Sequence, residues 1–141
     1  MSPKAFLDRL DEISREIARR EDRAGTLRHL AASLPSMIRR DTRVQVSPRP
    51  DRLESLLSEA VDEERRADVL REEHGDLLVT LGLALSRLPD PRMARLLELR
   101  YLAGWPWEDV AGEMCLSLSR IFKLHRQAMS LLPDFPDAPA N

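Results

Sequence analysis

Aromatic side chains are scarce in this sequence of 141 residues. One tyrosine, two tryptophans and three phenylalanines make up 4% of it, whereas charged residues make up 33%. This balance suits long, solvated helices better than a dense globular core. Glycine is also rare, with five residues, and leucine, alanine, arginine and glutamate dominate the composition. Because these residue types favour helix, the composition predicts an all-α protein.

Further absences restrict the compartment and the partners. Cys115 is the only cysteine, so no disulfide can form within the chain, which fits a reducing cytoplasm. No apolar run approaches the roughly 20 residues of a membrane span, and the stretch "MSPKAFLDRLDEI" is too charged for a secretory signal. The 22 Lys and Arg residues nearly balance 24 Asp and Glu, so no global positive field indicates nucleic acid. We expect a soluble cytoplasmic protein without a membrane partner.

Catalytic and metal-binding patterns are missing as well. The sequence holds no glycine-rich phosphate loop, no nucleophile elbow and no constellation of carboxylates. His29, His74 and His125 are far apart and lack the spacing of metal ligands. We therefore expect no catalytic residues, no metal site and no cofactor, and we interpret the chain as a protein that is not an enzyme.

Two long stretches have apolar residues at alternating intervals of three and four, the spacing of a coiled-coil or bundle seam. The first should begin at Pro3 and end near Leu34, because Pro35 follows. The second should begin at Asp51, where Glu54 completes a capping box. The first seam comprises Phe6, Leu10, Ile13, Ile17, Arg20 as a break, Ala24, Leu27, Ala31 and Leu34. The second seam comprises Leu56, Ala60, Glu63, Ala67, Leu70, His74, Leu77, Leu81, Ala84 and Leu88, with polar interruptions at Glu63 and His74.

These patterns predict a long antiparallel helical hairpin, coiled-coil-like, over residues 1–89. Residues 35–50 should form an ordered connector in which "RVQVS", residues 43–47, could pair as a short strand. The connector carries Arg39, Arg40, Arg43 and Arg49. Because two helices bury little surface on each face, either the C-terminal helices or a second chain should cover the rest. We expect a homo-oligomer formed through residues 3–88.

Residues 90–132 predict a helix, a tight link, a short helix, a turn and a last helix. Asp90 and Pro91 suit a helix start, and Gly104 suits a left-handed helix end. Ser117 should cap the last helix, which Pro133 ends. This economy of elements is typical of a helix-turn-helix, in which one helix braces the DNA backbone and the next enters the major groove. Residues 133–141 hold three prolines and should form a disordered tail.

The segment "LLELRYLAGWPWEDVAGEMCLSLSRIFKLHRQAMSLL" resembles region 4 of bacterial sigma factors and related domains of small phage proteins. The matching positions are Arg100, Tyr101, Gly104, Trp107, Glu108, Asp109, Val110, Ala111, Ser117, Ser119, Arg120, Leu124, His125 and Ala128. The wider layout resembles a family of phage and prophage proteins, some of which are thought to regulate late genes. The resemblance implies a DNA-binding helix-turn-helix that acts in the cytoplasm of a bacterial host.

The sequence departs from this family at two places. Many such turns carry glycine where Cys115 stands, because that residue often has a positive φ. The resemblance also implies that Leu118, Ser119, Phe122 and Lys123 face the groove, yet two of these side chains are apolar. Leucine and phenylalanine cannot make the bidentate hydrogen bonds that discriminate bases, although they can touch a thymine methyl group. The stripe of Leu118, Phe122, His125 and Met129 could face the groove, the N-terminal hairpin or a partner.

The candidate DNA-binding residues all lie between the expected cap of the last helix and its third turn. They are Ser117, Leu118, Ser119, Arg120, Phe122, Lys123 and Arg126. Arg120 could reach a phosphate, or it could pair with Glu113 or Asp109 across the turn. We interpret Trp105 and Trp107 as packing residues and Cys115 as a small buried hydrophobe.

Two functions of different classes remain open. The first is a phage-type transcription regulator that binds double-stranded DNA and whose helical N-terminus dimerises or contacts host RNA polymerase. The second is a protein-interaction or assembly module, including a small-terminase-like packaging component, which uses Leu118 and Phe122 to bind protein. The near-neutral charge favours the second function and the pattern of residues 117–126 favours the first.

Overall fold

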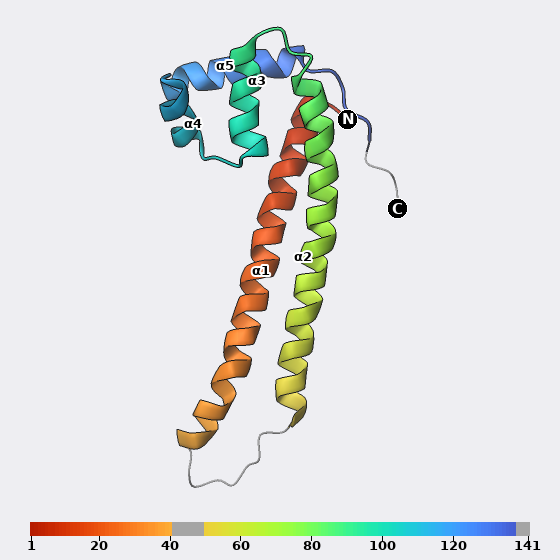
Figure 1. Ribbon diagram of the computed structural model, residues 1–141, viewed down its shortest axis with the longest axis vertical. Coiled ribbons are helices and arrows are strands. Elements are labelled where there is room, and N and C mark those ends of the chain that lie inside the picture. Colours follow the sequence, from red (N-terminus) through yellow and green to blue (C-terminus); the bar gives the residue numbers. More distant parts are fainter. Residues whose placement is uncertain (41–49, 138–141) are drawn as a thin grey trace. The chain divides into compact units, whose positions relative to one another are not determined.

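The computed structural model describes residues 1–40 and 50–137, and all regular structure in them is helical (Figure 1). The predicted all-α fold is therefore confirmed. The elements are α1 (Pro3–Arg40), α2 (Pro50–Leu85), α3 (Pro91–Leu97), a π-helical turn η1 (Glu98–Leu102), α4 (Trp107–Met114) and α5 (Leu118–Leu131).

The helices form two compact units, and the boundaries between these units differ from the expected one between residues 89 and 90. We call the unit that contains the C-terminus the C-terminal unit. One unit is Ile13–Glu72, and the other joins Met1–Glu12 to Glu73–Asn141. Each long helix thus contributes one end to the C-terminal unit. About 40 residues of helix-turn-helix alone can bury little apolar surface, so additional helical turns enlarge the core.

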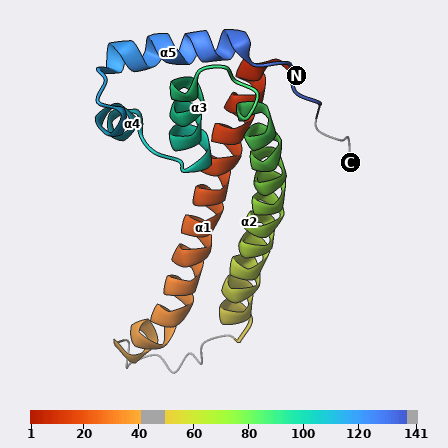
Figure 2. The same ribbon diagram turned by 45° about the horizontal axis from the view of Figure 1, so that its top comes forward.

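Within the unit Ile13–Glu72, α1 and α2 lie side by side and antiparallel (Figures 1 and 2). The buried apolar residues of this pair are Ile13, Ala24, Leu27, Ala31, Ala60 and Ala67. All of them belong to the two predicted seams, so the predicted antiparallel pairing is confirmed here. Alanine dominates the α2 side because small side chains let two helix backbones approach closely.

The polar interruptions of the two seams face each other. Arg20 Nη1 lies 3.0 Å from Glu63 Oε2, and the Glu63 side chain is buried. Arg23 and Arg66 approach the other Glu63 oxygen at 3.4 and 3.1 Å. The hydrogen bond from Arg20, together with these charges, lowers the pKa of the Glu63 carboxyl although burial opposes the shift. A buried carboxylate is tolerable here because cations surround it.

The end of α1 differs from the prediction. The helix continues through Pro35 to Arg40 instead of ending near Leu34. Proline cannot donate a backbone hydrogen bond, but its fixed φ is helical, so the residues after it can resume the helix. The backbone of Arg39 and Arg40 is therefore helical, whereas Arg49 and the possible strand at residues 43–47, which includes Arg43, lie outside the described residues.

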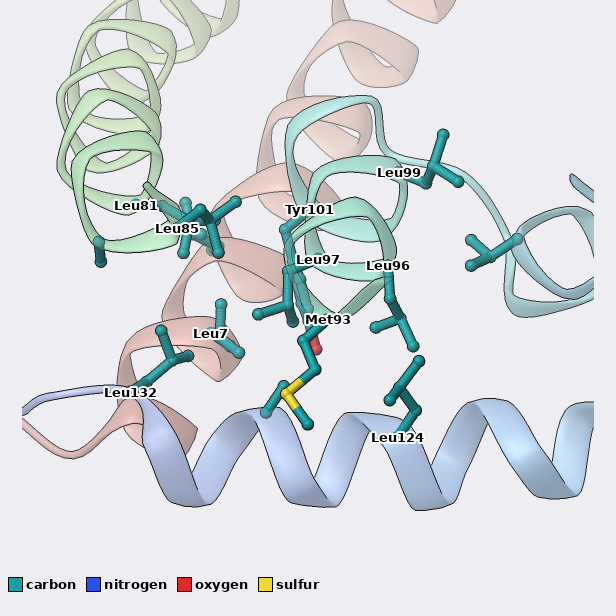
Figure 3. Close-up of a cluster of buried hydrophobic side chains, with 14 of the residues drawn as sticks. Leu7, Leu81, Leu85, Met93, Leu96, Leu97, Leu99, Tyr101, Leu124 and Leu132 are labelled. Atoms are coloured by element: carbon teal, nitrogen blue, oxygen red, sulfur yellow. The ribbon is translucent and has the colours of Figure 1, made fainter. Parts of the chain in front are cut away.

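The core of the C-terminal unit gathers side chains from five helices and from the chain after α5 (Figure 3). Leu7 comes from α1, Leu81 and Leu85 from α2, and Leu96 and Leu97 from α3. Helix α4 adds Val110 and Ala111, and helix α5 adds Ile121, Leu124 and Ala128. Helices α3, α4 and α5 thus share one core with the N-terminal end of α1 and the C-terminal end of α2.

The chain after α5 also differs from the prediction of a disordered tail. Phe135 is 4% exposed and stacks on Phe6, with ring centroids 3.9 Å apart. The Phe135 backbone N–H donates to the Met1 carbonyl at 2.8 Å. Residues 133–137 are therefore held against α1, while residues 138–141 lie outside the described residues.

Candidate nucleic-acid interface

Helices α4 and α5 are joined by a turn with one left-handed residue. Cys115 has φ 56° and ψ 39°, which confirms the predicted positive φ. The N–H groups of Cys115 and Leu116 donate to the carbonyls of Gly112 and Ala111, a Schellman-type helix end. The Ser117 hydroxyl then accepts from Arg120 N at 3.2 Å and caps α5. The Cys115 side chain is exposed, so its predicted burial was wrong.

Helix α5 separates cleanly into a buried and an exposed face. Ile121, Leu124 and Ala128 are buried in the core. All the candidate DNA-binding residues are exposed, namely Ser117, Leu118, Ser119, Arg120, Phe122, Lys123 and Arg126. The structure thus brings the candidates together between the cap and the third turn of one helix, outside its buried face.

The three cations of this exposed surface lack an acidic partner in the part of the chain that the structure describes. Among the described residues, no carboxylate lies within 4 Å of Arg120, Lys123 or Arg126. The suggested pairing of Arg120 with Glu113 or Asp109 is not present; Glu113 instead lies 4.0 Å from Arg95. Uncompensated cations are available to phosphate oxygens.

A hollow of about 180 Å³ lies beside these cations. Its lining residues are Arg92, Leu116, Arg120, Lys123, Leu124 and Gln127. Three of the six carry a positive charge, and Gln127 adds an amide, so the hollow suits an anionic group such as a phosphate. Sequence reasoning missed Arg92 and Gln127. Arg92 lies at the start of α3, and only the packing of α3 on α5 brings it beside Gln127 and the cations of α5.

Arg92 is fixed at the start of α3 by Asp90. The Asp90 carboxylate accepts from Arg92 N at 2.9 Å and lies 3.3 Å from its guanidinium. The backbone hydrogen bond is the main cause that lowers the pKa of Asp90. This cap confirms the predicted helix start at Asp90 and Pro91, and it determines where the Arg92 side chain leaves the helix.

The apolar stripe of α5 has two different environments. Phe122 is 40% exposed and meets Trp107 edge-on, with ring centroids 5.3 Å apart and planes at 70°. His125 meets the same indole at 5.1 Å, and Met129 packs against the core. Leu118 is 39% exposed. The stripe is therefore half packing surface and half free surface, with the division at Phe122.

Behind this stripe, Arg100 and Tyr101 complete a polar and aromatic cluster. The Arg100 guanidinium lies 4.9 Å from the Trp107 ring centroid, donates to the Trp105 carbonyl at 3.0 Å and lies 3.6 Å from Asp11. This places both tryptophans in packing roles, as predicted, and both are partly buried against the core. The cluster holds Trp107 in place, and Trp107 in turn supports Phe122.

The cluster also contains a partly buried hydrogen bond. The Tyr101 hydroxyl lies 3.0 Å from His125 Nε2. Burial raises the pKa of Tyr101 to about 12 and lowers the pKa of His125. Burial disfavours the charged form of each group, so both are neutral near pH 7, and the neutral imidazole can accept a hydrogen bond from the Tyr101 hydroxyl at Nε2.

Comparison of the chain with protein-family models, with curated proteins and with solved structures found no match. The likeness to sigma-factor region 4 therefore depends on the motif in residues 96–132 alone. Across the residues that the structure describes, no three potential metal ligands cluster, and no helix is both long and apolar enough to cross a membrane.

Proposed function

We propose that the chain is a DNA-binding transcription regulator of the phage and prophage type. Helix α5 would enter the major groove of double-stranded DNA, in the cytoplasm of a bacterial host. The observation that carries the proposal is the exposed start of α5, where Arg120, Lys123 and Arg126 have no acidic partner among the described residues. The positive-φ turn and the Ser117 cap fix where α5 begins, and its packing on the core leaves the opposite face exposed, as a reading helix requires.

Phosphate contacts would position the helix, and base contacts would specify the site. Arg92, Arg120 and Lys123 surround the hollow and would contact the DNA backbone. Ser119 and Arg126 would reach base edges, while Leu118 and Phe122 would touch thymine methyl groups. The helical N-terminal part would contact host RNA polymerase or a second copy of the chain.

A salt-titrated binding assay on random duplex DNA tests the proposal. The affinity should fall steeply with salt, by about 0.9 log units per log unit of salt for each phosphate neutralised. Lys123→Ala and Arg126→Ala should each lower this slope by about one phosphate's worth. Arg15→Ala is the matched control, because Arg15 is an exposed arginine of α1 that likewise lacks a carboxylate within 4 Å among the described residues.

Absence of salt-dependent binding, or equal slopes for Arg15→Ala and Lys123→Ala, would contradict the proposal. In that case the second function, a protein-interaction or assembly module such as a small-terminase-like packaging component, becomes the better one. The partial exposure of Leu118 and Phe122 favours that alternative, because exposed apolar side chains on a rigid helix suit a protein partner.

Phe122→Ala tests whether the Phe122 side chain belongs to the core or is free to bind a partner. We expect the free energy of unfolding to fall by about 1–2 kcal/mol, because Phe122 loses one aromatic contact but not a full core site. Leu118→Ala, at nearly equal exposure, should cost less. A loss of about 3 kcal/mol or more for Phe122→Ala, measured by thermal melts, would identify the side chain as core rather than interface.

A further inference from the structure

Helix α2 has an apolar face that no other part of the described chain covers. Val79 and Leu83 are 66% and 65% exposed, among the most exposed large apolar side chains of the described chain. They lie one turn apart, on the side of the helix opposite Leu81 and Leu85, which point into the core (Figure 3). Helix α2 therefore has a second apolar face, which we call the outer face.

Two glycines, Gly75 and Gly82, border the outer face. A methyl group at Gly75 or Gly82 would meet no atom within 4 Å, and neither residue has a positive φ. Glycine is among the least favourable residues in a helix interior. Since no neighbouring atom in the described residues fills it, the space at Gly75 and Gly82 is open to side chains that approach from outside.

The charges at the two ends of the outer face are opposite. Asp76 lies before Val79, and Arg87 lies in the turn that follows α2; both side chains are exposed. Within residues 1–40 and 50–137, neither has an oppositely charged group within 4 Å. A parallel copy of this face would place like charges together, whereas an antiparallel copy would place Asp76 near Arg87 twice.

We infer that the outer face of α2 is a self-association surface that binds the same face of a second copy, antiparallel, about a two-fold axis at the level of Leu81. Val79 then packs against Leu83 of the second copy, and Arg87 passes over Gly75 to pair with Asp76. A two-fold axis repeats each contact, so two apolar contacts and two ion pairs form at once. This surface is separate from α5, and the inference does not depend on DNA binding.

Sedimentation of the full-length chain without DNA, over a range of concentrations, tests the inference. We expect a dimer, and Val79→Asp should raise its dissociation constant by roughly tenfold or more, because it buries an unpaired charge. Val69→Asp is the matched control. Val69 is 67% exposed and lies on the same helix, ten residues or about 15 Å before Val79. It should leave the dissociation constant unchanged.

A charge exchange separates specific pairing from general damage. Asp76→Arg and Arg87→Asp should each weaken the dimer, and the double variant should restore it, because the pair is then reversed. A monomeric wild-type chain at high micromolar concentration would overturn the inference. So would equal behaviour of the Val79 and Val69 variants, or a double exchange without recovery. Loss of DNA binding alone would leave the inference intact.

Discussion

Cys115 has the only positive φ among the described residues other than glycine. Its position between α4 and α5 predicted that angle from sequence, because helix-turn-helix turns commonly need a left-handed residue there. The side-chain environment did not follow from the same reasoning. A lone cysteine is usually buried, but the left-handed backbone turns this one outward.

Replacing Cys115 by glycine should raise the free energy of unfolding slightly, by up to about 1 kcal/mol, because glycine adopts a positive φ without steric cost. Cys115→Ala retains a Cβ atom and should melt at nearly the wild-type temperature. Thermal melts of the two variants measure the difference. A clearly lower melting temperature for the glycine variant would show that the thiol contributes packing that the structure does not display.

His125 makes stability depend on pH. Its pKa is lowered by burial from about 6.5, so the unfolded chain binds a proton more readily than the folded chain. The stabilising contribution is therefore complete above about pH 6.5 and is lost as the pH falls through the lowered pKa. Chemical unfolding of wild type and His125→Gln between pH 8 and pH 5 should show a wild-type decline that is smaller in the variant. Parallel curves for the two proteins would contradict it.

At the scale of elements, the pairing of α1 with α2 could be predicted from the three-four spacing alone. The contact between Arg20 and Glu63 could also have been predicted. Both had been identified as breaks in their seams, and in an antiparallel hairpin two breaks at matching heights must meet. The sequence could not reveal that Arg23 and Arg66 would also approach the Glu63 carboxylate, because the positions of these two side chains depend on the rotation of each helix about its axis.

Glu63→Gln should lower the melting temperature of the hairpin, because it leaves Arg20 beside a neutral partner in a buried layer. The double replacement of Arg20 and Glu63 by leucine should restore or exceed wild-type stability, because an apolar layer needs no paired charges. Glu64→Gln is the control, since the pair of Arg28 and Glu64 is exposed and contributes little. Equal melting temperatures for Glu63→Gln and Glu64→Gln would show that the buried ion pair stabilises the hairpin no more than the exposed pair does.

At the scale of the whole molecule, the helical class and most helix starts were predictable, but the compact units were not. Periodicity shows which side of a helix is buried, not which distant segment buries it. Phe135 illustrates the limit. The prolines and aspartates of residues 133–141 are typical of a disordered segment. The buried ring of Phe135 nevertheless anchors residues 133–137 to α1. The end of α1 was also predicted from a local rule, namely that proline ends a helix, but the helix continues through Pro35 to Arg40.

Phe135→Ala should lower the free energy of unfolding by about 3 kcal/mol, because a nearly fully buried ring leaves a cavity beside Phe6. Asp134→Ala changes a neighbouring exposed residue and should have almost no effect. Limited proteolysis should show the same order, with the C-terminal segment cut sooner in the phenylalanine variant. Equal melting and equal cleavage would mean that the tail is not part of the core.

The π-helical turn η1 has a consequence for comparing this chain with any relative. The Ala103 N–H donates to the Glu98 carbonyl five residues earlier, at 2.9 Å, so this turn holds one residue more than an α-helical turn. In a regular helix an added residue rotates everything after it by about 100°, but a π turn absorbs it locally. A homologue that lacks one residue between 98 and 102 would therefore keep Gly104, α4 and α5 in phase. Its alignment with this chain should place a one-residue gap there, with α4 and α5 aligned without a further gap.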